Sequence, residues 1–334
     1  MSPFQALSLP NGVLIPNRIA KAAMEENMAD QDNAPSRQLM ELYRAWADGE
    51  AGLLLTGNVM IDRRAMTGPG GVVLEDERHL EKFRQWAAIG KAKSAQVWMQ
   101  LNHPGRQTLA NLGQTSLAPS AVALEMGEFS KLFAEPRPMT EADIEAVIAR
   151  FARSAQLAEQ AGFSGVQIHA AHGYLLSQFL SPLSPGFCVA VKLNSADFQR
   201  GGFDADDARQ VIEWLNTQAV DLVELSGGSY EAPAMQGEAR DGRTLAREAY
   251  FLEMAADLAK VAQMPLMVTG GIRRLPIVEQ VLDSGVAMAG IATALAVEPN
   301  LPRHWREGRD SHPQLPPIRW KKKPLAAWQW SNSS

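Results

Sequence analysis

The sequence predicts an α/β fold in which eight parallel strands close into a (β/α)8 TIM barrel. Three observations support this fold class: short apolar runs at regular intervals, amphipathic runs between most of them, and a length of 334 residues. Alternating strand and helix patterns are typical of parallel sheets wrapped by helices, and barrels of this size commonly form one domain. We expect a single domain over 1–334, with the barrel at about 17–308 and a tail at 309–334.

A β-hairpin is predicted ahead of the barrel. Within 7–15, two short apolar pieces flank Pro10, Asn11 and Gly12, a strong turn signal, and such a hairpin can plug one end of a barrel. Eight strands are the number that a closed barrel of this type needs. The predicted strands are 18–24, 52–58, 95–102, 165–170, 187–194, 220–226, 265–270 and 286–291.

Helical patterns separate most of these strands. In 36–48 the apolar residues recur at i, i+3, i+4 and i+7, the spacing of a packed helix. Thr140, followed by Glu141 and Asp143, is typical of a capped helix N-terminus. Further helices are predicted at 205–217, 247–262 and 275–284.

The fourth β/α unit is short. Only 174–186 lies between the fourth and fifth predicted strands, and it contains prolines and glycines near its end. A parallel crossover normally needs a dozen or more residues, usually with a full helix. A single short helix over 175–180 would have to make this connection.

Composition excludes several classes of protein. The formal net charge of −5 is mild, which argues against a nucleic-acid partner. No apolar stretch approaches the roughly 20 residues that cross a bilayer, and no signal peptide is indicated. The single cysteine, Cys188, excludes an internal disulfide and a multi-cysteine metal site. We expect a cytoplasmic protein that acts on a small molecule without a metal ion.

Glycine-rich loops follow the seventh and eighth predicted strands. Barrels of this type often bind phosphate there, on backbone N–H groups. The residues in question are Gly270 and Gly271, then Gly290, Ala292 and Thr293. Ordinary tight turns are an equal alternative for each loop alone, but two such loops at both expected places favour phosphate binding.

His169, His172 and Tyr174 follow the fourth predicted strand. Two imidazoles at this spacing can each donate an N–H to one carbonyl oxygen, and a tyrosine hydroxyl nearby can donate a proton. The structural alternative is a histidine that only caps backbone groups. A metal site is a weaker interpretation, because no third ligand has suitable spacing.

Lys192 lies at the end of an apolar strand, where an unpaired cation is costly. It could stabilise negative charge on a cofactor, act as a Schiff-base nucleophile, or form a structural ion pair with Glu224. Gln100 could hydrogen-bond a ring edge that carries a donor and an acceptor. Its structural alternative is a buried amide that satisfies loop backbone groups.

These motifs occur in a recognisable order from about Phe4 to Trp305. The most specific are Gln-Leu-Asn-His-Pro-Gly-Arg at 100–106 and His-Ala-Ala-His-Gly-Tyr at 169–174. The others are 16–19, 22–24, 177–182, 224–228, 269–273, 290–294 and 298–299, together with Lys192. The chain resembles the Old Yellow Enzyme family of NAD(P)H:flavin oxidoreductases.

The resemblance implies a flavoprotein with FMN held non-covalently over the strand ends. Backbone contacts to the flavin would come from Ala22, Ala23, Met24 and Gly57. Gln100 would bind the pyrimidine edge, and Lys192 would lie near N1 and the C2 oxygen. The phosphate would be held by Gly270, Gly271, Gly290, Ala292 and Thr293.

The resemblance also implies an ene reductase. His169 and His172 would bind the carbonyl oxygen of the substrate, and Tyr174 would protonate Cα. In the ping-pong cycle of the family, NADH or NADPH reduces the flavin, which then passes hydride to an activated alkene. Barrels of this kind often pair, so a homo-oligomer is an open expectation, and the sequence specifies no particular substrate.

The chain departs from the family pattern in three places. Ala292 and Thr293 stand where many relatives have Gly-Arg, with Arg273 as a candidate substitute, and Glu25 stands where some have cysteine. Relatives also continue into a long helix where Ser184 here joins Pro185. Either this sequence lacks residues of the natural protein, or it is a variant with an open-sided barrel. We favour the first, because the second would expose strand faces.

Two other functions compete with the ene reductase. The first is a barrel aldolase that uses Lys192 as a Schiff-base lysine, supported only by a lysine on a strand. The second is a non-catalytic binder of flavin or phosphate, suggested only by the short crossover.

Overall fold

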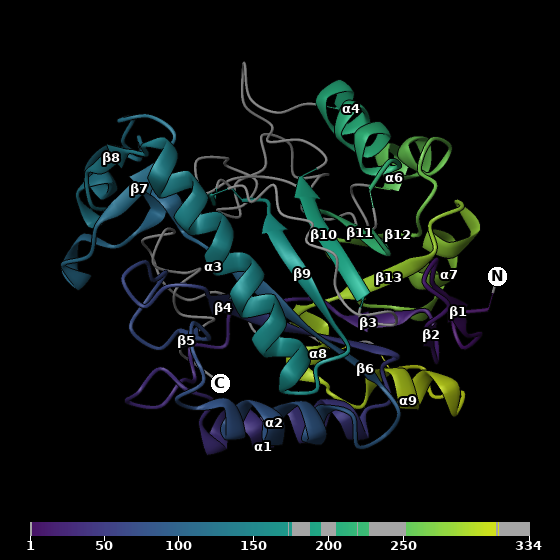
Figure 1. The fold of residues 1–334 in the computed structure, drawn as a ribbon. Coiled ribbons are helices and arrows are strands. Elements are labelled where there is room, and N and C mark those ends of the chain that lie inside the picture. The colour runs from purple at the N-terminus through teal and green to yellow at the C-terminus, as the bar shows by residue number, and fades with distance from the viewer. Residues whose placement is uncertain are drawn as a thin grey trace.

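The computed structural model describes residues 2–172, 174–175, 188–194, 205–218, 220–226, 252–311 and 313. Its centre is a closed barrel of eight parallel strands, as predicted (Figure 1). The barrel strands are β3 (Ile19–Lys21), β4 (Leu53–Met60), β6 (Gln96–Asn102), β9 (Gly165–Ala170), β10 (Cys188–Asn194), β11 (Leu222–Ser226), β12 (Leu266–Thr269) and β13 (Met288–Ile291). Pairing of β3 with both β13 and β4 closes the ring, and β5 (Val72–Val73) pairs with the end of β4.

Helices surround the strands on the outside (Figure 1). They are α1 (Arg37–Asp48), α2 (Leu80–Gly90), α3 (Glu141–Gln160), α4 (Ala205–Leu215), α6 (Leu252–Ala259), α7 (Leu275–Asp283), α8 (Thr293–Val297) and α9 (Leu301–Arg306). The predicted start of α3 is confirmed, because Thr140 and Asp143 form a reciprocal capping box. Ser36 caps α1 by accepting the Leu39 amide (3.1 Å).

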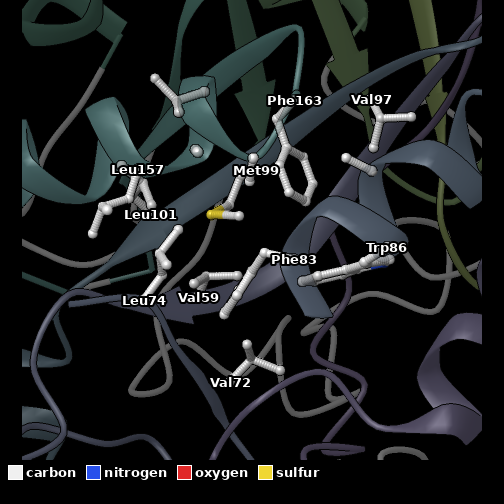
Figure 2. Packing of buried hydrophobic residues seen from close by; sticks show 14 of the residues in the cluster. Val59, Val72, Leu74, Phe83, Trp86, Val97, Met99, Leu101, Leu157 and Phe163 are labelled. Carbon is white, nitrogen blue, oxygen red and sulfur yellow. The ribbon is translucent and has the colours of Figure 1, made fainter. Parts of the chain in front are cut away.

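The outer core consists of two apolar clusters between helices and strands, one in the first half of the barrel and one in the second. Phe83 and Trp86 of α2 pack with Phe163 and with Met99 of β6 (Figure 2). Trp86 meets Phe163 edge to face, with ring centroids 5.6 Å apart. This packing holds β4 and β6, two of the strands that carry the candidate site, against their helices.

The inner core joins the barrel to the hairpin of β1 (Leu7–Ser8) and β2 (Leu14–Ile15). These strands are antiparallel, and Leu7 and Ile15 belong to the same apolar cluster as Trp98 inside the barrel. The hairpin turn reaches Cys188, the first residue of β10, because Asn11 Nδ2 donates to Cys188 Sγ (3.4 Å). The hairpin therefore packs at the amino-terminal ends of the strands, away from the end where barrel active sites lie.

Cys188 is completely buried at this end. Burial raises the pKa of its thiol to about 12.

Some elements differ from the sequence predictions. Strand β3 ends at Lys21, three residues before the predicted end, because its pairing with β13 and with β4 ends at that residue. Between β6 and α3, short 3-10 helices precede a two-stranded parallel sheet of β7 (Ser116–Ala118) and β8 (Pro136–Pro138), which the sequence did not predict. The Ser184–Pro185 junction and most of the predicted helix at 175–180 lie outside the described residues. No helix in the described ranges is long and apolar enough to span a membrane.

Candidate active site

A buried polar network crosses the barrel interior. Gln100 Nε2 donates to Gln167 Oε1 (2.7 Å), and Gln167 Nε2 donates to Glu224 Oε2 (2.6 Å). The other Glu224 oxygen accepts from the Thr269 hydroxyl (2.8 Å) and pairs with the Lys192 ammonium. Five consecutive strands, β6, β9, β10, β11 and β12, each contribute one of these side chains. The structure thus brings Gln100 and Lys192 into one network.

Lys192 forms the ion pair with Glu224 that the structural interpretation predicted. The side chain is almost fully buried, and the two residues are in register on neighbouring strands. An ammonium in contact with a carboxylate is not a nucleophile, which weighs against the Schiff-base alternative. An ammonium has three N–H donors. Among the residues that the structure describes, Glu224 is its only hydrogen-bonding partner, so Lys192 keeps donors for a bound group.

His169, His172 and Tyr174 gather at the carboxyl end of β9. The ring centroids of the two histidines are 5.0 Å apart, and the Tyr174 ring is 4.8 Å from that of His169. His169 is in register with Lys192 on the adjacent strand. The three predicted catalytic side chains therefore lie in one small region next to the polar network.

Both histidines are held in the neutral form. Burial lowers the pKa of His169 well below its usual value, with smaller contributions from His172 and Lys192. Burial, and then the charge of Lys192, lowers the pKa of His172 to about 3. His169 Nδ1 accepts the amide N–H of Ala171 (3.3 Å), so the ring proton resides on Nε2. His169 thus caps a backbone group, as its structural alternative predicted, and still presents one N–H donor.

The backbone of His172 has an unusual conformation. Its φ of 59° lies in the left-handed region, which residues with side chains seldom adopt. Gln107 Nε2 donates to its carbonyl oxygen (2.7 Å), and its amide donates to Asn194 Oδ1 (3.3 Å). Ser226 Oγ lies 3.4 Å from His172 Nε2. Contacts from three separate segments therefore determine where this imidazole points.

The predicted phosphate loops lie next to each other. Strands β12 and β13 are neighbours, and Thr269 pairs in register with Gly290. The residues that follow are Gly270 and Gly271 after β12, and Ala292 and Thr293 after β13. A Cβ on Gly290 would lie 2.2 Å from Thr269 Oγ1, so this close approach requires glycine. Gly271 has φ 69°, and Arg273 follows in the same loop.

The residues predicted to line the flavin through their backbone also lie together. Ala22, Ala23 and Met24 follow β3 directly, and the Ala22 amide bonds the Ile291 carbonyl of β13 (2.9 Å). A Cβ on Gly57 would lie 2.0 Å from the Met24 carbonyl oxygen, so the two segments touch.

Both polar backbone groups of Gly57 already have partners. Its N–H donates to Glu26 (3.1 Å), and its carbonyl accepts the Thr56 hydroxyl (2.8 Å). Gly57 therefore has no unused N–H, and a ligand here would contact it mainly through van der Waals packing.

Comparison with known proteins gives the family. The family model described as "NADH:flavin oxidoreductase / NADH oxidase family" matches residues 3–188. An NADH-dependent flavin oxidoreductase of Hypocrea jecorina is 31% identical over 89% of this chain and 87% of its own length. The chain belongs to this family of flavin oxidoreductases.

Other family members differ in length from this chain. An NADH-dependent flavin oxidoreductase of Neonectria sp. is 36% identical over 89% of the chain, which spans only 46% of that protein. Among solved structures, an old yellow enzyme homologue from Zymomonas mobilis aligns with a TM-score of 0.74. The two sequences are 20% identical, and the alignment covers 94% of this chain and 95% of the homologue. This likeness supports the barrel fold.

The residues at the strand ends fit the flavin that the family name implies. Lys192 keeps N–H donors, Gln100 uses only one amide group in its contact with Gln167, and two glycine-rich loops adjoin each other. A further polar group points to a ligand. Asn102 is fully buried, and within the described part of the chain neither amide atom has a hydrogen-bonding partner.

Asn102 and a second ion pair were missed from the sequence. Asn102 lies two residues beyond Gln100 on β6, so both side chains face the barrel interior, and strand alternation could have indicated this. Lys21 is fully buried and pairs with Glu26 (3.3 Å). Lys21 could have been identified by the same sequence signal as Lys192, which is a cation within an apolar strand.

Proposed function

We propose that this protein is an FMN-dependent ene reductase. It would transfer hydride from NADH or NADPH, through non-covalently bound FMN, to the activated C=C bond of an α,β-unsaturated carbonyl compound or a similar acceptor. The observation that carries the proposal is the convergence of two neutral histidines and Tyr174 beside the Gln100–Lys192 network. The relatives named as NADH-dependent flavin oxidoreductases support it.

Residues from six places in the barrel would hold the cofactor. Lys192 would place positive charge near the flavin pyrimidine ring, and Gln100 would bind the edge of that ring. Segment 22–24 and Gly57 would pack against the isoalloxazine, and the loops after β12 and β13 would bind the phosphate through backbone N–H groups. When bound, FMN supplies the hydride-transfer chemistry, while the protein supplies orientation and charge.

The histidine pair would bind the substrate. Each neutral imidazole offers one N–H, and two donors aimed at one carbonyl oxygen stabilise the negative charge that develops there as hydride reaches Cβ. The Tyr174 hydroxyl would then deliver a proton to Cα, which completes net addition of H⁻ and H⁺ across the double bond. Because Lys192 helps to keep both rings neutral, it would also influence their role as donors.

Absorption spectroscopy under anaerobic conditions tests the proposal. Purified protein, incubated with FMN and desalted, is expected to be yellow, to bleach with NADH or NADPH, and to recover its colour on addition of cyclohexenone. Protein that retains no flavin would contradict the proposal. Flavin that binds but is never reoxidised by cyclohexenone or a quinone would instead indicate a non-catalytic binder.

Substitution of the histidines tests their assigned role. His172→Ala is expected to slow reoxidation by cyclohexenone by about 100-fold, the scale of a lost oxyanion donor, without slowing the bleaching step as strongly. Borohydride treatment with a carbonyl substrate serves as the control for the aldolase alternative, and it should leave Lys192 unmodified.

A further inference from the structure

Strand β4 contains a bulge beside the candidate site. Its pairing with β6 shifts register between Leu55 and Asn58, so Thr56 and Gly57 fall out of the regular ladder. Bulges are common next to active sites because they redirect the strand, and the displaced backbone groups need other partners.

Side chains supply these partners. Thr56 Oγ1 accepts a hydrogen bond from the backbone N–H of Gln100 (2.9 Å). The Gly57 amide lies 3.1 and 3.2 Å from the two carboxylate oxygens of Glu26. The Leu55 carbonyl accepts a hydrogen bond from Lys21 Nζ (2.7 Å). The bulge is therefore held from β3, from the loop after it and from β4 itself.

Glu26 is itself held in place by buried groups. The Tyr43 hydroxyl of α1 donates to Glu26 Oε1 (2.6 Å), and Lys21 Nζ lies 3.3 Å from the same oxygen. The Lys21 ammonium also lies 4.4 Å from the centre of the Trp46 ring, a favourable cation–π position. A Cβ on Gly57 would lie 2.1 Å from Glu26 Oε2, so the carboxylate packs directly against the glycine.

We propose that Glu26 is a positioning residue of the active site, and that Lys21 and Tyr43 support it. By accepting the Gly57 amide, the Glu26 carboxylate maintains the bulge and with it the surface formed by Gly57 and segment 22–24. This inference rests on the proposed function, in which that surface packs against the flavin. The role of Lys21 is to neutralise the buried carboxylate.

Titration of flavin-free protein with FMN, followed by quenching of flavin fluorescence, tests this inference. Glu26→Gln removes the carboxylate and leaves the Lys21 ammonium buried without an anion, so we expect FMN affinity to fall about tenfold. The reduction potential of the remaining bound flavin should rise, because a nearby positive charge is no longer neutralised. Tyr43→Phe should weaken affinity only a few-fold, and it serves as the second variant if Glu26→Gln does not fold.

A double variant separates positioning from general stabilisation. Lys21→Met combined with Glu26→Gln removes both charges, so the reduction potential and the melting temperature should return toward those of the parent. FMN affinity should stay weak, because the substitution replaces one of the two oxygens that face the Gly57 N–H with an NH2 group, which cannot accept this hydrogen bond. Glu41→Gln is the matched control, because it removes the carboxylate of a solvent-exposed ion pair with Arg37 on α1. This variant should change none of these quantities.

The possible outcomes are distinct. Parent-like FMN affinity in Glu26→Gln, or restored affinity in the double variant, would overturn the positioning role while leaving the proposed function intact. A parent protein that does not bind FMN would overturn both.

Discussion

Lys21 and Lys192 are both buried in the barrel and both pair with a glutamate, but their remaining donors differ. Lys21 has three partners for its three N–H groups: the Leu55 carbonyl, Glu26 and the Tyr43 hydroxyl. Over the described ranges Lys192 has Glu224 alone. A lysine with every donor occupied is suited to holding structure, whereas one with unused donors can bind a ligand. Burial of a cation therefore does not by itself identify a functional residue.

The largest effect that would test this contrast is on flavin reduction. In Lys192→Met, the rate of flavin reduction by NADH at saturating FMN should fall about 100-fold or more, because a preorganised charge next to the developing negative charge is lost. In Lys21→Met the same rate should fall less than about tenfold. Stopped-flow absorbance measures both, and equal losses in the two variants would remove the distinction.

Stability provides the reverse contrast. Lys21→Met leaves Glu26 buried without its cation, and we expect the free energy of unfolding to drop by about 3 kcal/mol. Urea denaturation of flavin-free protein measures it. Exposed Lys260, which pairs with Asp257 at the surface, provides the control, since Lys260→Met should cost less than about 1 kcal/mol. A Lys21 variant as stable as this control would contradict the structural role.

The pKa values of His169 and His172 depend on the charge of Lys192 and not on that of Lys21. The folded-state pKa of His172 is about 3, below the usual value near 6.5, so between these values the unfolded chain binds more protons. The contribution of His172 to the free energy of unfolding should therefore be fully present above about pH 6.5. It should be lost progressively as the pH drops toward 3. The slope is at most about 1.4 kcal/mol per pH unit for this residue.

Urea denaturation between pH 7 and pH 4 measures this slope. His172→Gln should flatten it. Lys192→Met should also flatten it in part, because the lysine charge opposes protonation of both rings. Lys21→Met combined with Glu26→Gln, which leaves no unpaired buried carboxylate, should leave the slope unchanged, and a flattened slope in that double variant would show that the two cations act on the same groups.

The smallest expected effect concerns Asn102. Leucine has a similar branched shape but no polar atoms, so Asn102→Leu should raise the stability of flavin-free protein by about 1 kcal/mol. Asn216 is the matched control, because its side chain donates to the Val261 carbonyl and accepts the backbone N–H of Gln263. Asn216→Leu should therefore be destabilising. If both variants lose stability equally, Asn102 is not an unsatisfied group in the folded chain.

Much of the barrel could be predicted from the sequence because its signals are local. All eight predicted strands overlap barrel strands, the helix predicted at 36–48 matches α1, and the capping signal at Thr140 lies at the true start of α3. These features depend on short apolar runs, helical periodicity and one hydroxyl at the correct position. None of them requires knowledge of distant contacts.

The candidate site was predicted only in part, because several of its contacts join distant segments. His169 and Lys192 were found individually, but the chain of hydrogen bonds through Gln167 could not be seen without strand order. The bulge at Gly57 and its contact with Glu26 are likewise non-local. The placements of His169, His172 and Tyr174 agree with their predicted roles, which stay predictions until activity is measured.

The buried thiol of Cys188 bears on the proposed reaction with activated alkenes. Activated alkenes alkylate thiolates, and a residue that loses its proton only near pH 12 offers almost no thiolate under physiological conditions. The sulfur also lies against the hairpin, at the far end of the barrel from the histidines. If the protein is the ene reductase proposed above, we expect its single cysteine to stay unmodified in the presence of reactive enones.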